Sequence, residues 1–469
     1  MMVMGTTLRD LLNRARWRDG DLHALEICLL HRGAPDDRRI VSGARVVEVR
    51  AGGVELVPDT GESETQFVPY HRFLSIRIAD GDVVWDKDAR GVVRSVRAEK
   101  SPVALPLDEG TEVLPSFDVV LRAAGQMPMV IDGSAGEGGG QILRTSLALS
   151  MVTGTPFVLE RIRAGRRKGG LMRQHLTCVK AAAAVCDAET EGASLGSTRL
   201  VFRPRAIRGG THELDVGSAG SVCLVLQTIA LPLVLGAEPS HLVVRGGTHA
   251  LWAPTFPFLA EAWLPLVRAA GAELTLSLSK TGFYPAGGGE VVMTTSPSGS
   301  LAPIHLVDPR VGELEIGAHA IVAGLSEGIA RREVVAAAER LTGLRLSMSS
   351  ASVHSPGPGN AMWLSARDPK SGITNVFSQI GEPDVRAEDV GRAAADALLS
   401  WRASGASVEA HLADQVMLPI ALAGVGSFTS NALTLHSRTN IEVIHAFTGR
   451  RLRAWDLGGS RFRVGLAPS

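Results

Sequence analysis

A glycine-rich stretch, Asp132-Gly-Ser-Ala-Gly-Glu-Gly-Gly-Gly-Gln-Ile-Leu-Arg144, constrains the fold more than any other part of this chain. A short apolar run precedes it, and apolar residues at helical spacing follow from Gln141 to Met151. A strand, a glycine turn and a helix in this order direct backbone N–H groups toward an anion. Glu137 would repel a phosphate unless a cation lay between them, so we interpret it as a candidate metal contact. From these residues alone, an ordinary glycine-rich turn explains the loop equally well.

The chain also repeats part of this stretch. Gly133-Ser-Ala-Gly136 recurs as Gly217-Ser-Ala-Gly220, and an apolar, helix-like run follows each copy. A glutamine, a proline and a glycine also span nine positions twice, at Gln227–Gly236 and at Gln415–Gly424. Three related strand-loop-helix units in a pseudo-repeated α/β body are therefore predicted. Chance reuse of small residues is the alternative, and the identical tetrapeptide weighs against it.

The length of 469 residues predicts more than one hydrophobic core. We expect a small β-rich domain over 1–95, a linker with one strand over 96–126, an α/β body over 127–308 and 404–455, and an inserted domain over 309–403. The first domain begins with a candidate helix around Leu8–Ala15 and continues with short alternating segments. These predict strands at Ala44–Val49, Val54–Val57, Phe73–Ile78 and Val83–Trp85. Helices are expected at Gly328–Leu341 and Ala387–Ala403 in the insert.

Composition excludes several classes of protein. The net charge is zero, so nucleic acid must be bound by a local basic patch rather than by a global field. Residues 161–173 carry six positive charges interrupted by glycines, which favours such a patch over a solvated loop. The four cysteines show neither C-x-x-C nor zinc-ligand spacing, and no apolar stretch is long enough to span a membrane. A cytoplasmic protein is expected; its oligomeric state is left open.

The candidate nucleophile is a histidine. The chain lacks the P-loop lysine, the K-x-D-G lysine and H-E-x-x-H, and its one G-x-S-x-G match, at 192–196, follows a polar stretch instead of a strand. His436 follows a helix expected over 415–422 and lies at a strand-like end, with Thr439 and Asn440 placed to hold the ring or a ligand. A satisfied structural histidine is the alternative. The segment Thr281–Gly289 is equally an ordinary hairpin or a nucleotide platform.

Taken together, these segments resemble the RNA 3′-terminal phosphate cyclase family over about 127–455. The pieces that carry the resemblance follow the order of the family: 132–144, 162–165, 171–180, 217–232, 246–248, 282–289, 357–360, 411–419 and 436–440. The resemblance implies three βα units, each with two helices on a four-stranded sheet, and a smaller inserted α/β domain. It also implies an ATP-dependent enzyme that acts on RNA with a 3′-phosphate end.

The implied reaction uses His436 as the nucleophile. The histidine attacks the α-phosphate of ATP, pyrophosphate leaves, and AMP passes from the histidine to the RNA 3′-phosphate. The neighbouring 2′-OH then closes a 2′,3′-cyclic phosphate and releases AMP. By the same resemblance Glu137 holds a divalent metal, Mg or Mn. Arg144, Arg163 and Gln174 contact phosphates, and Asp414, Gln415 and His411 contact the nucleotide. His411 stands where the family often has an aromatic residue, and imidazole can still stack on a base.

Two alternative functions stay open. A non-catalytic RNA-binding or assembly factor of the same fold is disfavoured by the presence of His436, because the inactive branch of the family lacks it. A 5′-end adenylating nucleotidyltransferase would share the first step. Residues 5–95 resemble a small prokaryotic family of unknown function that is proposed to be associated with RNA metabolism, and we expect this domain to be non-catalytic.

Overall fold

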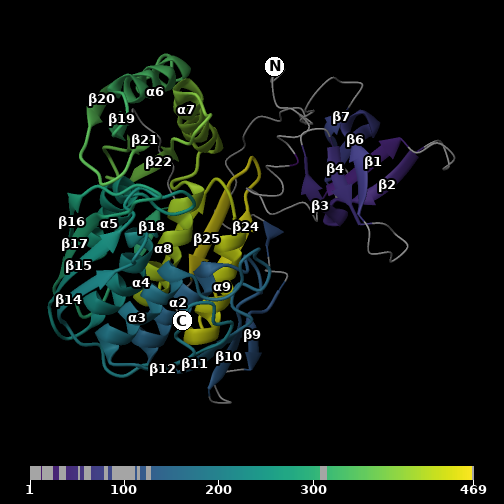
Figure 1. Ribbon diagram of the computed structural model, residues 1–469. Helices are drawn as coiled ribbons and strands as arrows, with labels where there is room; N and C mark the ends of the chain where they lie inside the picture. Colours follow the sequence, from purple (N-terminus) through teal and green to yellow (C-terminus); the bar gives the residue numbers. More distant parts are fainter. Residues whose placement is uncertain are drawn as a thin grey trace. The chain divides into compact units, whose positions relative to one another are not determined.

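The computed structural model divides the chain into two compact units, Met1–Pro106 and Leu107–Ser469 (Figure 1). The structure describes residues 12, 25–30, 38–50, 53–57, 65–78, 83–86, 111–113, 117–122, 128–306 and 314–466. The helix expected near Leu8–Ala15 lies outside these residues except for Leu12, which is buried.

The described residues of the first unit form two antiparallel sheets. One has the order β2-β1-β6-β7 and the other the order β3-β4-β5. Their strands are β1 (Leu25–Leu30), β2 (Arg38–Ser42), β3 (Val46–Val49), β4 (Gly53–Leu56), β5 (Gln66–Pro69), β6 (Phe73–Ile78) and β7 (Val83–Asp86). The strand predicted at 73–78 is confirmed, whereas the one predicted from Ala44 begins two residues later because a short 3₁₀ turn occupies 43–45. The prediction missed β1, β2 and β5.

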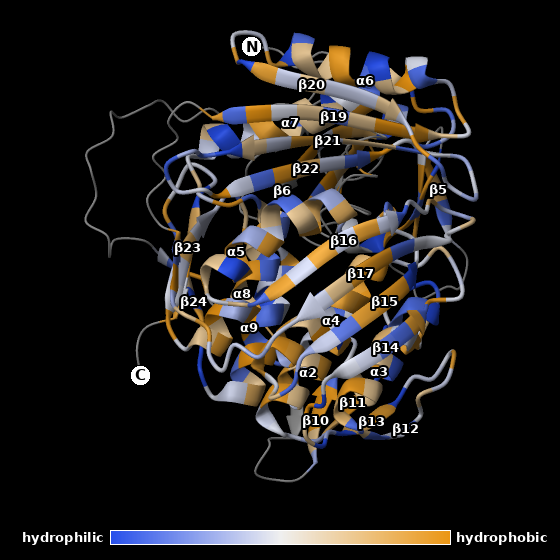
Figure 2. Ribbon diagram, turned by 90° about the vertical axis from the view of Figure 1, so that its left-hand side faces the viewer, coloured by the Kyte–Doolittle hydropathy of each residue, from blue (hydrophilic) through white to orange (hydrophobic). Residues whose placement is uncertain are grey.

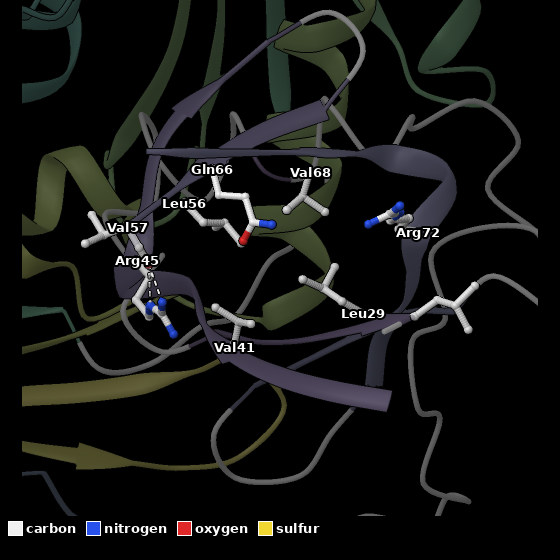
Figure 3. A pocket seen from close by; sticks show the side chains of 9 residues that line it. Leu29, Val41, Arg45, Leu56, Val57, Gln66, Val68 and Arg72 are labelled. Atoms are coloured by element: carbon white, nitrogen blue, oxygen red, sulfur yellow. Dashed lines mark hydrogen bonds between the residues drawn. The ribbon is translucent and has the colours of Figure 1, made fainter. Parts of the chain in front are cut away.

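Inward side chains of these strands form a core of their own, which includes Ile27, Val54, Phe73 and Ile76. A small pocket opens at its edge (Figure 3). Apolar side chains of β1, β2, β4 and β5 form its wall, and Arg45, Gln66 and Arg72 add polar groups. The Arg45 guanidinium donates to the Val57 carbonyl through Nε at 2.8 Å.

The second unit contains three sheets built with the same strand pairing. In each, two parallel strands are followed by an antiparallel pair. The first sheet consists of β12 (Glu189–Glu191), β13 (Leu200–Arg203), β11 (Phe157–Glu160), β10 (Met129–Asp132) and β9 (Val120–Arg122). The second consists of β14 (Gly210–Asp215), β15 (Ser240–Gly246), β17 (Gly289–Thr295) and β16 (Leu274–Lys280). The third consists of β18 (Ile304–Leu306), β23 (Gly426–Ser430), β25 (Phe462–Leu466), β24 (Arg453–Asp456) and β8 (Thr111–Glu112).

Helices pack between these sheets and share one large core. They are α2 (Gly140–Thr153), α3 (Arg173–Cys186), α4 (Val222–Leu235), η5 (Phe258–Trp263) with α5 (Leu264–Ala269), α8 (Ala410–Ala423) and α9 (Leu435–Thr448). Nearly every residue of α4 is buried, which matches a helix that is apolar on all faces (Figure 2). Helix α2 contacts α3, α4 and α9, so it joins the beginning of this unit to its end.

A fourth sheet, β20-β19-β21-β22, lies between β18 and α8 in the chain and has a separate core. Its strands are β19 (Glu315–Ala323), β20 (Leu346–Ser352), β21 (Gly359–Arg367) and β22 (Thr374–Ile380), and α6 (Glu327–Arg340) and α7 (Ala387–Ser404) pack on it. Both helices predicted in this region are confirmed within one residue at each end.

The mixed α/β class predicted for the chain is confirmed. The uniform count of four strands is not reproduced, because the three sheets have five, four and five strands among the described residues. Two strands, β8 and β9, come from the segment expected to be a linker with one strand. The finer domain boundaries stay predictions. In the described part of the chain, no helix is both long and apolar enough to cross a membrane.

Candidate active site

The glycine-rich loop lies between β10 and α2, as its sequence predicts. Gly136 has a φ of +58°, and a Cβ at this position would lie 2.4 Å from Thr439 Oγ1 of α9. Only glycine therefore satisfies both the left-handed backbone and the close approach. The next residue, Glu137, donates its backbone N–H to Thr439 Oγ1 at 3.1 Å. The loop is thus attached to a helix that comes 302 positions later in the chain.

A buried polar junction joins the three helices α2, α8 and α9. Asn440 Oδ1 accepts hydrogen bonds from Thr145 Oγ1 at 2.8 Å and from Gln141 Nε2 at 3.1 Å. Asn440 Nδ2 donates to the backbone carbonyl of Asp414 at 3.0 Å. Gln141 in turn accepts a bond from Arg144 Nη2 at 2.7 Å. This network fixes the starts of α2 and α9 relative to each other.

His436 lies in the first turn of α9, and its side chain is 46% exposed. The expected strand-like end is wrong: Thr434 accepts a hydrogen bond from the Ser437 N–H at 2.9 Å and thereby caps a new helix. His436 Nε2 is 4.0 Å from Glu137 Oε1. A phosphate at this imidazole would therefore meet the N-terminus of a helix, where unpaired N–H groups favour negative charge.

Asp414 is buried beside His436 and has its carboxylate held by hydroxyl groups. Thr434 Oγ1 donates to it at 2.9 Å, and Ser437 Oγ also donates. Burial raises the pKa of the Asp414 carboxyl, and the His436 ring, the two hydroxyl groups and His411 oppose that shift. The Asp414 carboxylate therefore lies within electrostatic range of the His436 ring, and a carboxylate at this place can stabilise a positive imidazole.

Arg144 and Gln415 lie on one cavity. Its lining comes from α2, α4, η5, α8 and α9 and comprises Gln141, Arg144, Thr145, Gln227, Thr228, Leu231, Trp263, Asp414, Gln415, Leu418 and Asn440. Burial lowers the pKa of the Arg144 guanidinium, while Cys178 and Glu137 act in the opposite direction. Since arginine side chains are not deprotonated in proteins, Arg144 brings a cation to this cavity.

The basic stretch predicted to be a phosphate patch folds over Glu137. Arg163 Nη1 donates to the carbonyls of Lys168 at 2.7 Å and Gly170 at 3.1 Å, which holds the base of the loop. Arg166 pairs with the Glu137 carboxylate and also donates to its backbone carbonyl at 3.0 Å. Burial, reinforced by Arg166, lowers the pKa of Arg163, and Glu137 opposes the shift. The patch therefore already contacts a carboxylate of the candidate site.

Gln174 and His411 occupy different positions. Gln174 begins α3, and its Oε1 accepts the Ser221 N–H at 3.2 Å, beside the second glycine turn. His411 begins α8, is 87% exposed at its side chain, and places Nδ1 3.0 Å from Glu409 Oε2. The structure thus places Glu137, Arg144, Asp414, Gln415 and His436 around one junction, with Arg163 beside it. It places Gln174 on the second glycine turn and directs His411 toward solvent.

Glu137 is the residue that the sequence predicts as a candidate metal contact. Its side chain is 10% exposed, and Oε2 is buried without a hydrogen-bond partner. In the described residues no group of three or more His, Cys, Asp or Glu side chains gathers to form a cage for a metal. A single carboxylate suits Mg²⁺ or Mn²⁺ when nucleotide phosphates complete the coordination. The residues present therefore fit a metal that arrives with a nucleotide.

Sequence reasoning left four contributors out of the predicted site: Gln141, Arg166, Thr434 and Ser437. Arg166 belonged to the recognised basic patch, but its pairing with Glu137 depends on how the loop folds back. Thr434 had a local signal, because threonine is a preferred residue before the first turn of a helix. Gln141 and Ser437 had none, since the bonds that bring them into the site are to Asn440 and Asp414, which are 299 and 23 positions away.

The arrangement combines a half-exposed imidazole, the buried carboxylate of Asp414, the largely buried carboxylate of Glu137 and several arginines around a glycine loop. Such a set suits nucleophilic attack on a phosphate ester.

Comparisons with known proteins point to one family. The family model described as RNA 3′-terminal phosphate cyclase matches residues 135–454. A protein of that name from Ralstonia nicotianae is 49% identical over 318 residues, which covers 68% of this chain and 90% of the relative. One from Koribacter versatilis is 47% identical over 323 residues, 68% of this chain and 89% of the relative. One from Ectopseudomonas mendocina is 44% identical over 318 residues, 68% and 92% respectively.

Proposed function

The chain belongs to the RNA 3′-terminal phosphate cyclase family, and on this premise we propose that it converts an RNA 3′-phosphate into a 2′,3′-cyclic phosphate with ATP. The observation that carries the proposal is the distance of 4.0 Å between His436 Nε2 and Glu137 Oε1. The two residues come from segments near the beginning and the end of the second unit. The non-catalytic alternative gives no reason for a half-exposed histidine to lie at that place.

In the first step we assign the nucleophile to the His436 imidazole. Its nitrogen bonds to the α-phosphorus of ATP, the bond between that phosphorus and the bridging oxygen breaks, and pyrophosphate leaves. Asp414, coupled to His436, stabilises the positive ring that forms. The N–H groups at the start of α9 face the developing charge on the phosphate oxygens.

We assign Glu137 to holding a divalent metal, Mg²⁺ or Mn²⁺. Such a metal would supply positive charge that neutralises phosphate charge. Arg144 and Arg163 are cations beside this place, and we assign them to phosphate binding together with Gln174. Asp414, Gln415 and His411 are assigned to the nucleotide.

In the second step AMP moves from His436 to the RNA 3′-phosphate, which frees the imidazole and leaves an activated diphosphate. In the third step the adjacent 2′-OH attacks the 3′-phosphorus, loses its proton, and displaces AMP. The reacting hydroxyl is already held next to the phosphorus by the ribose, so ring closure has a large advantage of proximity.

The repeated architecture is part of the proposal. The parallel pairs β10–β11, β14–β15 and β18–β23, each followed by an antiparallel pair, support three related units. The third unit would be interrupted by the sheet of residues 315–380 with its helices. A cytoplasmic location is proposed as well, supported by the free thiols of all four cysteines.

The decisive experiment labels the protein with α-³²P ATP and a divalent metal, with no RNA present. We expect label on the wild-type protein, mapped by mass spectrometry to a peptide that contains His436, and none on His436→Ala. His445→Ala, on the same helix, is the matched control and should label normally. Equal labelling of His436→Ala and wild type would refute the mechanism.

The substrate is tested separately with two oligonucleotides. An RNA with a 3′-phosphate should become resistant to phosphatase only when ATP is added. An RNA with only a 5′-phosphate should not become adenylated, and stable 5′-adenylation in place of cyclisation would favour the 5′-end adenylating enzyme.

A further inference from the structure

Two aromatic side chains near the second glycine turn are exposed without an evident structural reason. Trp252 is 83% exposed and Tyr284 is 72% exposed. Of the tryptophans and tyrosines whose side chains the structure describes, no other is exposed. Aromatic rings contribute most to stability when they are buried, so two open rings in neighbouring loops indicate a surface that meets a ligand.

The two rings extend from loops that are hydrogen-bonded to each other. Trp252 follows β15, and Tyr284 lies in the turn between β16 and β17. Thr248 N donates to the Gly282 carbonyl at 2.9 Å, and the His249 and Phe283 rings lie 5.4 Å apart beneath. Thr248, His249 and Phe283 are all almost fully buried, so the exposed rings rest on a firm base.

The backbone at Trp252 supports a functional reading. Its φ of +61° lies in the left-handed region, which costs a bulky residue on the order of 1–3 kcal/mol. Because the side chain is exposed, burial of its ring offsets little of that conformational free energy. Glycine or asparagine would suit the turn better, so the tryptophan is present for its ring.

A continuous series of contacts connects these loops with the candidate site. Gly247 N donates to the Gly220 carbonyl at 2.8 Å, and Ser221 N donates to Gln174 Oε1 at 3.2 Å. The next residue, His175, lies against the start of α2, where a Cβ on Gly140 would be 2.5 Å from its Nε2. The aromatic loops, the second glycine turn and the first glycine loop are therefore linked by direct contacts.

We propose that Trp252 and Tyr284 form a stacking platform for bases of single-stranded RNA just upstream of its 3′-phosphate. This inference rests on the proposed function. The π-face of every base can stack on an aromatic ring, so the platform would hold RNA ends of any sequence. The chain has no net charge to attract a polyanion, which gives such contacts added importance.

The test measures the affinity of the full chain for two fluorescently labelled RNAs by anisotropy. Both carry a 3′-phosphate, and in one of them the last four nucleotides are abasic. Trp252→Ala and Tyr284→Ala should each bind the normal RNA about tenfold more weakly than wild type. Trp252→Phe should stay near wild type, and Met348→Ala, which removes another exposed side chain, should not change binding. With the abasic RNA, wild type and the alanine variants should bind equally.

ATP labelling without RNA separates this inference from the proposed function. The alanine variants should still accept AMP as wild type does. Unchanged RNA affinity in both variants would overturn the platform and leave the rings to a protein partner. Loss of AMP labelling with unchanged RNA affinity would also overturn it, because the rings would then serve the nucleotide. If wild type itself never accepts AMP, the proposed mechanism fails while the binding data still decide on the platform.

Discussion

Replacing Asn440 by alanine should both destabilise the second unit and disturb the candidate site. The amide makes three buried hydrogen bonds, to Gln141, Thr145 and the Asp414 carbonyl, and is 2% exposed. Each bond contributes about 1 kcal/mol net, and partners left unsatisfied in the interior add to the cost. The expected loss is therefore about 3–5 kcal/mol.

This loss corresponds to a small but measurable change in melting temperature. The entropy of unfolding is about 2.1 cal/mol/K per residue, which for Leu107–Ser469 amounts to about 0.8 kcal/mol/K. A loss of 3–5 kcal/mol should lower Tm by about 4–6 °C in scanning calorimetry. Labelling by ATP should fall as well at temperatures where the variant is folded, because Asn440 sets α9 relative to α2.

Asn431→Ala is the matched control. Asn431 precedes the same helix, and its Oδ1 is buried without a hydrogen-bond partner. Its loss should change Tm far less than the loss of Asn440. If the two variants melt together, or if Asn440→Ala melts with wild type, the hydrogen-bonded junction does not hold these helices and the reasoning is refuted.

Three further changes test other parts of the molecule. Gly136→Ala places a Cβ 2.4 Å from Thr439 Oγ1 of α9 at a φ of +58°. It should lower the free energy of unfolding, measured by chemical denaturation, by at least about 1–2 kcal/mol. Gly165→Ala, whose Cβ meets nothing, should be nearly neutral. Burial raises the pKa of Glu333 to about 7, so the free energy of unfolding of wild type should fall by up to about 3 kcal/mol as pH rises from about 4.5 to 7. Glu333→Gln should lack this loss. Parallel Tm–pH curves for the two proteins would contradict the prediction. Arg166→Ala removes the cation paired with Glu137, so this variant should bind Mn²⁺ severalfold more tightly than wild type in titration calorimetry without ATP. Unchanged or weaker binding would argue against competition between Arg166 and the metal for Glu137.

The parts of the fold that sequence predicts best are those with local signals. The glycine loop follows β10 and precedes α2 because its glycines permit left-handed turns at 136 and 138, and the apolar spacing after Gln141 is helical. Helices α6 and α7 were equally accessible from their periodicity. The strands β8 and β9 were not, because two or three residues carry little pattern and their partners β24 and β10 decide the pairing.

In the candidate site, too, sequence predicts what depends on local signals and misses what depends on distant contacts. His436 was identified as a nucleophile by elimination and by resemblance, but its place in a helix depends on a cap by Thr434 that outweighed the strand-like sequence before it. The pairing of Arg166 with Glu137 and the bonds of Asn440 to Gln141 need the assembled core. Such contacts carry no periodic signal, since they join segments that are 29 positions apart in the first case and 299 in the second. The chemical roles of these residues stay predictions.

The bond between Glu137 and Thr439 also has a consequence during synthesis. At about 5–20 residues per second, a ribosome makes the glycine loop roughly 15–60 s before it reaches the 302nd position beyond Glu137. Throughout that interval the loop lacks the hydroxyl that receives its N–H. Under the proposed mechanism, a chain that ends before α9 also lacks His436 and accepts no AMP from ATP, so activity would begin only after α9 has been made.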